Sequence, residues 1–227
     1  SQKLSSKINS NIDKSLFKAF KNHSLPILRV YSWEDGITFG AGQSVDDFSL
    51  LKDEYKNKIG KRLTGGGVLF HGTDISYTIV LNPNMIENRD VKETYFLLCQ
   101  FLLKFYEKLG LKASFAKDNQ NIVLSKSPFC QVGFEAYDII IDNKKIGGNA
   151  QKRAKNCILQ HGSIALFKKE DSELYGNSLE DFSIKLSFED AKNMLIEAFK
   201  TTFNVEFIKD CLNKEEIDIL DSLNKDN

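Results

Sequence analysis

Three consecutive glycines between two strand-like segments constrain the fold of this chain more than any other feature. Gly65, Gly66 and Gly67 stand between Arg62 and His71. Because glycine weakens a strand, three together need a compensating reason, and the usual one is close approach of the backbone to a ligand. A tight hairpin or a bulge is the alternative. The flanking arginine and histidine favour a ligand site, and the spacing fits neither a P-loop nor a dinucleotide fingerprint.

The pattern of apolar residues predicts an α+β fold with a mixed, largely antiparallel sheet flanked by helices. Helices are expected at 10–20, 91–109, 187–203 and 215–223, with a short one at 45–55. Strands are expected at 27–33, 37–39, 61–63, 68–70, 75–81, 122–124, 137–142, 145–148 and 157–166, the last broken at His161-Gly162. We expect the strand at 68–70 to pair with the strand at 75–81. Residues 1–227 are predicted to form a single domain, with 180–227 as its C-terminal helical portion.

The first and third of these helices have predicted N-terminal caps. Ser10 or Asn11 is expected to cap the first helix, and Ser187 to cap the helix that follows it. The last helix is expected within the C-terminal portion, where it completes the same domain.

Charge and cysteine spacing exclude several classes of protein. Lys plus Arg and Asp plus Glu both number 31, so the formal net charge is zero, which argues against a nucleic-acid binder held by bulk charge. The four cysteines form no CxxC pair and no zinc pattern, so no metal site is predicted. No segment has the pattern of a signal peptide or the length of a membrane span. We therefore expect a cytoplasmic protein with free thiols and no membrane contact.

A second motif places a lysine at a double-glycine bend. Lys145 precedes Gly147 and Gly148 in a segment that continues to Gln151. Its amine can point into a site, whereas a solvated hairpin lysine is the ordinary alternative. The neighbouring Lys144 is expected to point to the opposite face, because side chains alternate along a strand.

One cysteine and one histidine are further candidates. Cys130 lies in a loop-like stretch between Pro128 and Gly133, where a thiol can be partly exposed and reactive. The other three cysteines lie in a helix, at a strand start and near the C-terminal tail, and are interpreted as structural. Two interpretations of His161 are open, namely a buried polar contact and a contact with substrate.

Three ordered motifs resemble those of the superfamily of lipoate–protein ligases, octanoyltransferases and biotin ligases. The segment Arg62 to His71 is similar to its Arg-x-Ser/Thr-Gly-Gly-Gly signature, Lys145 to Gln151 to its lysine element, and Ile158 to Ser163 to the His-Gly strand that follows. The resemblance implies the catalytic-domain fold of that superfamily. It also implies substrate-binding roles for Arg62, Thr64, Gly65, Gly66, Gly67, His71, Gly147, Gly148, Ala150, Gln151, His161 and Gly162.

The position of Cys130 indicates which branch the chain resembles. Cys130 precedes Tyr137 and Lys145, as in the cysteine-dependent octanoyl-[acyl carrier protein]:protein N-octanoyltransferases. This resemblance implies that Cys130 carries an octanoyl or lipoyl group as a thioester. It implies that Lys145 lowers the thiol pKa as an ammonium, or acts as a base when neutral and accepts the proton of the attacking amine.

The same resemblance implies the partners. The acyl donor would be acyl carrier protein, and the acceptors would be lysines of lipoyl domains in 2-oxoacid dehydrogenase E2 subunits or of glycine cleavage H protein. No cofactor is required, because the acyl group arrives on phosphopantetheine. A monomer is expected. Lys152, Arg153 and Lys155 form a candidate docking patch for an acidic carrier, with a solvated charged loop as the preferred alternative.

Other functions stay open. An ATP-dependent lipoate–protein ligase without an accessory domain would need ATP but no nucleophilic cysteine. An amidotransferase would move octanoyl or lipoyl between lipoyl-bearing proteins, and a non-catalytic scaffold would form no acyl adduct. A biotin ligase fits less well, because its biotin loop rich in glycine and arginine is not found.

Overall fold

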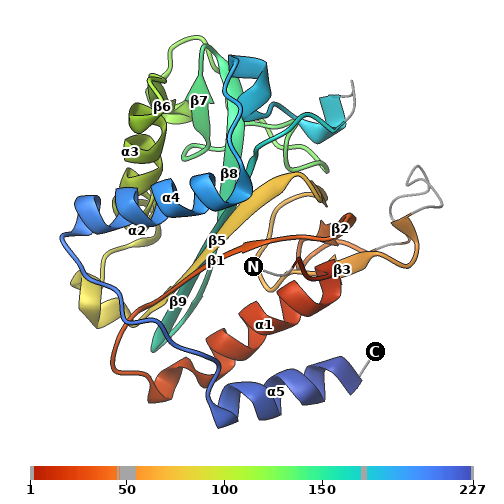
Figure 1. Cartoon of the computed structure of the whole chain (residues 1–227), viewed down its shortest axis with the longest axis vertical. Coiled ribbons are helices and arrows are strands. Elements are labelled where there is room, and N and C mark those ends of the chain that lie inside the picture. Colours follow the sequence, from red (N-terminus) through yellow and green to blue (C-terminus); the bar gives the residue numbers. More distant parts are fainter. Residues whose placement is uncertain (1–2, 45, 47–54, 170–172, 226–227) are drawn as a thin grey trace.

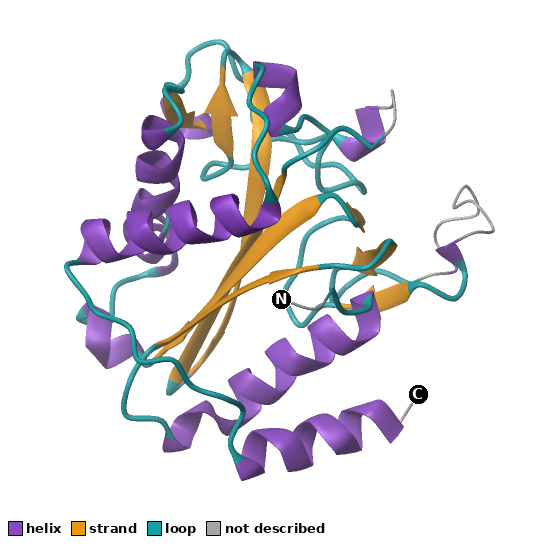
Figure 2. Ribbon diagram, viewed as in Figure 1, coloured by secondary structure: helices purple, strands orange, loops and turns teal. Residues whose placement is uncertain are grey.

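A twisted six-stranded sheet forms the centre of the molecule in the computed structural model, which describes residues 3–44, 46, 55–169 and 173–225. Its strand order is β1-β5-β9-β8-β7-β6, and every neighbouring pair is antiparallel. The strands are β1 (Ile27–Ser32), β5 (Asp74–Leu81), β6 (Ala113–Phe115), β7 (Ile139–Ile141), β8 (Lys144–Ala154) and β9 (Cys157–Ala165). Helices cover both faces of this sheet, as Figure 2 shows, which confirms the predicted α+β class.

A second, three-stranded sheet stands beside the first. In it, β2 (Gly36–Phe39) pairs in parallel with β3 (Ile59–Lys61) and antiparallel with β4 (Leu69–His71). The prediction that the strand at 68–70 pairs with the strand at 75–81 is therefore wrong. Both edges of β5 are taken by β1 and β9, and the chain turns between β4 and β5 at Gly72, whose φ is +120°. The glycine run thus connects β3 and β4, which flank β2 in the smaller sheet, and the turn at Gly72 leads from this sheet to the larger one.

Five α-helices flank the sheets in the part of the chain that the structure describes. The α1 helix (Ser6–Ala19) packs beside α5 (Lys214–Lys225), while α3 (Gln100–Lys108) and α4 (Phe188–Phe203) pack together on the opposite side (Figure 1). The α2 helix (Val91–Leu98) precedes α3. The short 3₁₀ helices are η1 (Phe20–Asn22), η4 (Pro83–Ile86), η5 (Ala116–Asp118), η6 (Glu173–Tyr175) and η7 (Leu179–Phe182).

The first helix begins earlier than the apolar stripe predicts. Ser5 caps α1 by accepting a hydrogen bond from the Ile8 amide, so neither Ser10 nor Asn11 is the cap. The extra first turn is polar but buried, because β3 packs directly against it. A Cβ on Gly60 would lie only 2.2 Å from the Ser6 carbonyl oxygen, which is why a glycine stands there. An apolar pattern cannot reveal a helical turn that is buried through its polar atoms.

The sheet separates two apolar clusters. The larger lies between the sheet and α2, α3 and α4, and contains the buried aromatic side chains Tyr77, Phe101 and Phe105. The smaller lies on the opposite face under α1, with Leu16 and Leu159 at its centre. The cavity described below opens on this second face, beyond the part that α1 covers.

Several local predictions need correction. The predicted 91–109 helix is two helices, because Cys99 leaves α2 with φ of −89° and ψ of −5° before α3 starts. The β9 strand is continuous through His161-Gly162. No strand forms at 122–124, where the Val123 side chain is 81% exposed. The helix predicted at 45–55 falls mostly outside the described residues.

The Ser187 cap of α4 and the last helix are confirmed. Nowhere in the described part of the chain is a helix both long and apolar enough to cross a membrane.

Candidate active site

A cavity of about 190 Å³ opens on the second face of the large sheet, between the glycine run and the loop that carries Cys130. Its floor is a row of residues that the strand register places side by side. Tyr31 pairs with Ser76, Ser76 with Ser163, and Ser163 with Gly148. Because the middle members of this row are small, space remains above the sheet. Tyr31, Trp33, Leu69 and Phe129 supply apolar walls.

Cys130 is held at this cavity by backbone pairing. The Val68 amide donates to the Pro128 carbonyl and the Cys130 amide donates to the Val68 carbonyl, both at 2.8 Å. This bridge needs a glycine next to it, since a Cβ on Gly67 would lie 2.5 Å from the Pro128 oxygen. The half-buried thiol faces β8, where a Cβ on Gly148 would lie 3.4 Å from its sulfur. The glycine motif and the cysteine therefore form one unit.

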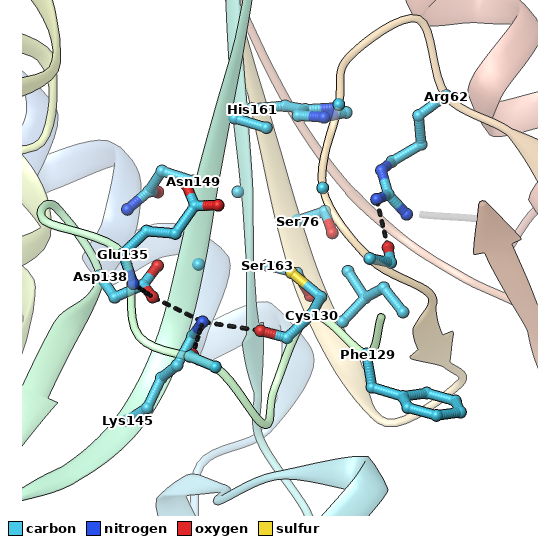
Figure 3. Close-up of a pocket in the computed structure, with 18 of the residues that line it drawn as sticks. Arg62, Ser76, Phe129, Cys130, Glu135, Asp138, Lys145, Asn149, His161 and Ser163 are labelled. Carbon is cyan, nitrogen blue, oxygen red and sulfur yellow. Dashed lines mark hydrogen bonds and ion pairs between the residues drawn. The ribbon is translucent and has the colours of Figure 1, made fainter. Parts of the chain in front are cut away.

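Lys145 lies beside this loop with its ammonium fully engaged. Its side chain is 4% exposed, and Nζ lies 2.6 Å from Asp138 Oδ2. Nζ also donates to the Cys130 carbonyl at 2.7 Å and to the Gly133 carbonyl at 2.8 Å (Figure 3). Three acceptors require three protons, so this lysine is an ammonium without a free lone pair. The expectation that it could act as a base does not fit this geometry.

Asp138 and Glu135 are site residues that the sequence reasoning missed. Burial raises the pKa of Asp138, and the charge of Lys145 opposes that rise. Glu135 borders the cavity with an exposed side chain, and its amide donates to Asp138 Oδ2 at 2.7 Å. The only signal in the sequence was a pair of carboxylates around Tyr137, just after the cysteine loop.

Arg62 holds the glycine run in place through hydrogen bonds from its guanidinium. Its guanidinium donates to the Gly67 carbonyl and to the Thr38 hydroxyl, both at 2.6 Å, and it is 7% exposed. Burial lowers the pKa of Arg62, and the nearby Cys130 sulfur opposes this effect when it is ionised. The arginine therefore fixes the glycine backbone and adds positive charge near the thiol.

The two histidines are both tied into buried polar networks. His71 Nδ1 lies 2.8 Å from Asp74 Oδ2, and the imidazole stacks on Trp33 with ring centroids 3.7 Å apart. Burial lowers the pKa of His71, and Asp74 opposes that change. His161 Nε2 lies 2.7 Å from Thr64 Oγ1 and its Nδ1 lies 3.4 Å from Asp13 Oδ2. Each histidine thus borders the cavity while its ring nitrogens face protein partners.

The structure brings together most of the residues singled out from the sequence. All of them border the cavity except Thr64 and Gly147. Thr64 contacts it only through His161, and Gly147 lies on the opposite face, where its Cβ position is 3.7 Å from the Tyr106 hydroxyl. Lys144 is exposed, as expected.

The other cysteines and the basic cluster differ from the cavity residues. Burial raises the pKa of both Cys99 and Cys157 to about 12, which leaves these thiols protonated, and Cys211 is exposed away from the cavity. Arg153 does not form a free patch, because it donates to Thr94 Oγ1 and to the Arg89 carbonyl at the start of α2. Among the described residues, no group of three or more His, Cys, Asp or Glu side chains is placed to hold a metal ion.

Comparison with known proteins gives the family. The family described as the lipoyl protein ligase A/B catalytic domain matches residues 6–200. The chain belongs to this family. The octanoyltransferase LipM of Bacillus cereus is 32% identical over 80% of this chain and 70% of its own length. The LipM octanoyltransferase of Clostridioides difficile is 26% identical over 95% of this chain and 90% of its own length. These curated relatives support an acyltransferase activity, so this lipoyl protein ligase A/B family member is an acyltransferase.

Solved structures of other proteins share the fold. A putative lipoate protein ligase from T. acidophilum superposes with a TM-score of 0.80 at 22% identity, covering 98% of this chain and 92% of the other. A lipoate-protein ligase A bound with ATP gives a TM-score of 0.75 at 20% identity, covering 98% and 94%. At these identities the likeness establishes the fold of the catalytic domain, as the resemblance in sequence implied.

Proposed function

We propose that this chain is an octanoyltransferase of lipoate biosynthesis that carries the octanoyl group on Cys130. The donor is octanoyl-acyl carrier protein, and the acceptor is the lysine of a lipoyl domain. The observation that carries the proposal is the half-buried Cys130 thiol at the mouth of a cavity, next to an ammonium and an arginine. The curated relatives named octanoyltransferase LipM support the same reaction.

The first half-reaction is a thioester exchange. The Cys130 thiolate attacks the thioester carbonyl of the donor, its sulfur bonds to that carbon, and the phosphopantetheine thiolate leaves. Lys145 Nζ donates to the Cys130 carbonyl, and Arg62 adds positive charge near the Cys130 sulfur. Backbone N–H groups of Gly65–Gly67, which lie outside the strands, can donate to the tetrahedral oxyanion. No cofactor is needed in this proposal, because the donor thioester is already activated.

The acyl chain is held by the apolar walls of the cavity. At about 0.8 kcal/mol for each buried methylene, an octanoyl chain gains on the order of 5 kcal/mol when it leaves water. Trp33 is well placed to end the chain, since it is 3% exposed and fixed between His71 and Ser76. The second half-reaction is attack on the Cys130 thioester by the acceptor amine, which gives a stable amide and frees the thiolate.

The experiment compares donors in the wild type and in Cys130→Ser, using an isolated lipoyl domain as acceptor. Octanoyl-acyl carrier protein without ATP is expected to support modification by the wild type and not by the variant. Free octanoate with ATP is expected to support neither. Modification by Cys130→Ser with octanoate and ATP would instead establish a ligase and contradict the proposal.

A further inference from the structure

The acceptor lysine presents a proton problem that the residues discussed so far do not solve. A lysine side chain has a pKa of about 10.4, so at pH 7 only about one in 2,500 is neutral and nucleophilic. The amine must also lose a second proton as the amide forms. A group at the cavity therefore has to bind an ammonium and remove its proton, which is the task of a general base.

In this structure Lys145 offers no basic atom to an incoming amine, because its Nζ donates to three acceptors. The same contacts also occupy Asp138, whose Oδ2 accepts from Lys145 Nζ at 2.6 Å and from the Glu135 amide at 2.7 Å. If Asp138 took a proton, it would leave a buried ammonium without its counter-charge, which is costly. These two residues are better suited to fixing the cysteine loop.

The remaining cavity residues that titrate are also engaged. His71 lies between Asp74 and Thr38, and His161 lies between Asp13 and Thr64. Burial raises the pKa of Tyr95 far above neutrality, so its hydroxyl keeps its proton. None of these groups presents a free basic atom to the cavity.

Glu135 is different from all of them. It lies five residues after Cys130 on the same loop and borders the cavity, and its side chain is exposed. Among the described residues its carboxylate has no ion-pair partner, although its negative charge acts on both Asp138 and Tyr95. Figure 3 shows Glu135 on the same side of the cavity as Asp138 and Lys145, with its side chain directed into the cavity.

We propose that Glu135 is the catalytic base of the second half-reaction, an inference that rests on the proposed function. Its carboxylate pairs with the incoming ammonium of the acceptor lysine and takes one proton from it. The neutral nitrogen then bonds to the carbonyl carbon of the Cys130 thioester. As the tetrahedral intermediate collapses, the carbon–sulfur bond breaks, the Cys130 thiolate leaves, and the remaining ammonium proton passes to solvent.

This role separates the two halves of the reaction, because the donor thioester brings no ammonium. Glu135 should therefore matter for transfer to lysine and not for loading of Cys130. It should not matter for a nucleophile that is already neutral at pH 7, such as hydroxylamine. A purely structural role for Glu135 would affect all three reactions alike.

The experiment measures the three reactions separately in the wild type, Glu135→Gln and Glu135→Asp. The control is Glu87→Gln, because the Glu87 carboxylate is exposed just after η4 and does not border the cavity. Loading is followed by intact mass with octanoyl-acyl carrier protein. The loaded enzyme is then mixed with a lipoyl domain or with hydroxylamine. Transfer to the lipoyl domain is expected to fall about a hundredfold in Glu135→Gln, the lower range for loss of a general base. Loading and hydroxylamine cleavage are expected to stay unchanged, and Glu135→Asp to retain part of the transfer rate.

A pH series adds an independent readout. In Glu135→Gln the transfer rate should rise about tenfold for each pH unit between 6.5 and 8.5, because the neutral fraction of the acceptor lysine rises by that factor. The wild type should rise much less steeply. Transfer at the wild-type rate by Glu135→Gln, or an equal loss in loading and hydroxylamine cleavage, would overturn this inference alone. A wild-type protein that never loads Cys130 would overturn the proposed function and this inference with it.

Discussion

Replacing Gly67 by alanine should misplace Cys130 without removing any polar side chain from the cavity. A Cβ at this position would lie 2.5 Å from the Pro128 oxygen and 2.7 Å from the Cys130 nitrogen. The Pro128 oxygen would have to retreat by about 0.9 Å to reach ordinary contact, and it belongs to backbone that cannot rotate away. Overpacking of this kind costs about 1–3 kcal/mol of stability.

The catalytic effect should be larger than the effect on folding. The retreat breaks the pair of 2.8 Å bonds that join Val68 to Pro128 and Cys130. A misplacement of the thiol by about 1 Å costs on the order of a hundredfold in rate. The assay is the rate of Cys130 loading by intact mass, with a urea melt of the same sample. Gly42→Ala is the matched control, because its Cβ would meet nothing within 4 Å and Gly42 does not border the cavity. Loading of Gly67→Ala at the wild-type rate, or equal damage in Gly42→Ala, would refute the reasoning.

Two further predictions concern the cavity wall and the buried histidine. Trp33→Ala should shift the donor preference toward longer acyl chains, by up to about fourfold for each added methylene that the enlarged cavity buries. Competition between octanoyl- and decanoyl-acyl carrier protein measures this preference. Phe96→Ala, on the exposed side of α2, should leave the preference unchanged. Because burial lowers the pKa of His71 below its unfolded value, the unfolded chain binds a proton first as pH falls. The free energy of unfolding should therefore decline below about pH 6.5 with a contribution of at most about 1.4 kcal/mol per unit, and His71→Asn should flatten the urea-melt profile between pH 7 and 5. A profile that His71→Asn leaves unchanged would contradict this account.

The sequence predicted the elements and the motifs better than the contacts between them. The strand alternation of β5 and the capped stripe of α4 are local signals, and both predictions are confirmed. The pairing of β4 with β2 depends on which strands already occupy the edges of β5, and no local pattern contains that information. The early start of α1 has the same origin, because its first turn is buried through polar atoms against Gly60.

The residues of the site also fall into those that the sequence predicted and those that it did not. The glycine run, Cys130 and Lys145 were found from residue type and spacing, and the fold places all three at one cavity. Glu135 and Asp138 carried no motif, since a carboxylate near a tyrosine is common in any sequence. Their importance depends on the saturation of Lys145 by three acceptors, which only the three-dimensional arrangement reveals.

The central claim is that Cys130 carries the acyl group, and intact mass tests it most directly. The protein is incubated with octanoyl-acyl carrier protein in the absence of ATP, and the adduct is located by digestion. The account predicts a mass gain of one octanoyl group on Cys130 that hydroxylamine removes and that is absent from Cys130→Ala. The account would be contradicted if the wild type formed no adduct, or if Cys130→Ala acquired the same one.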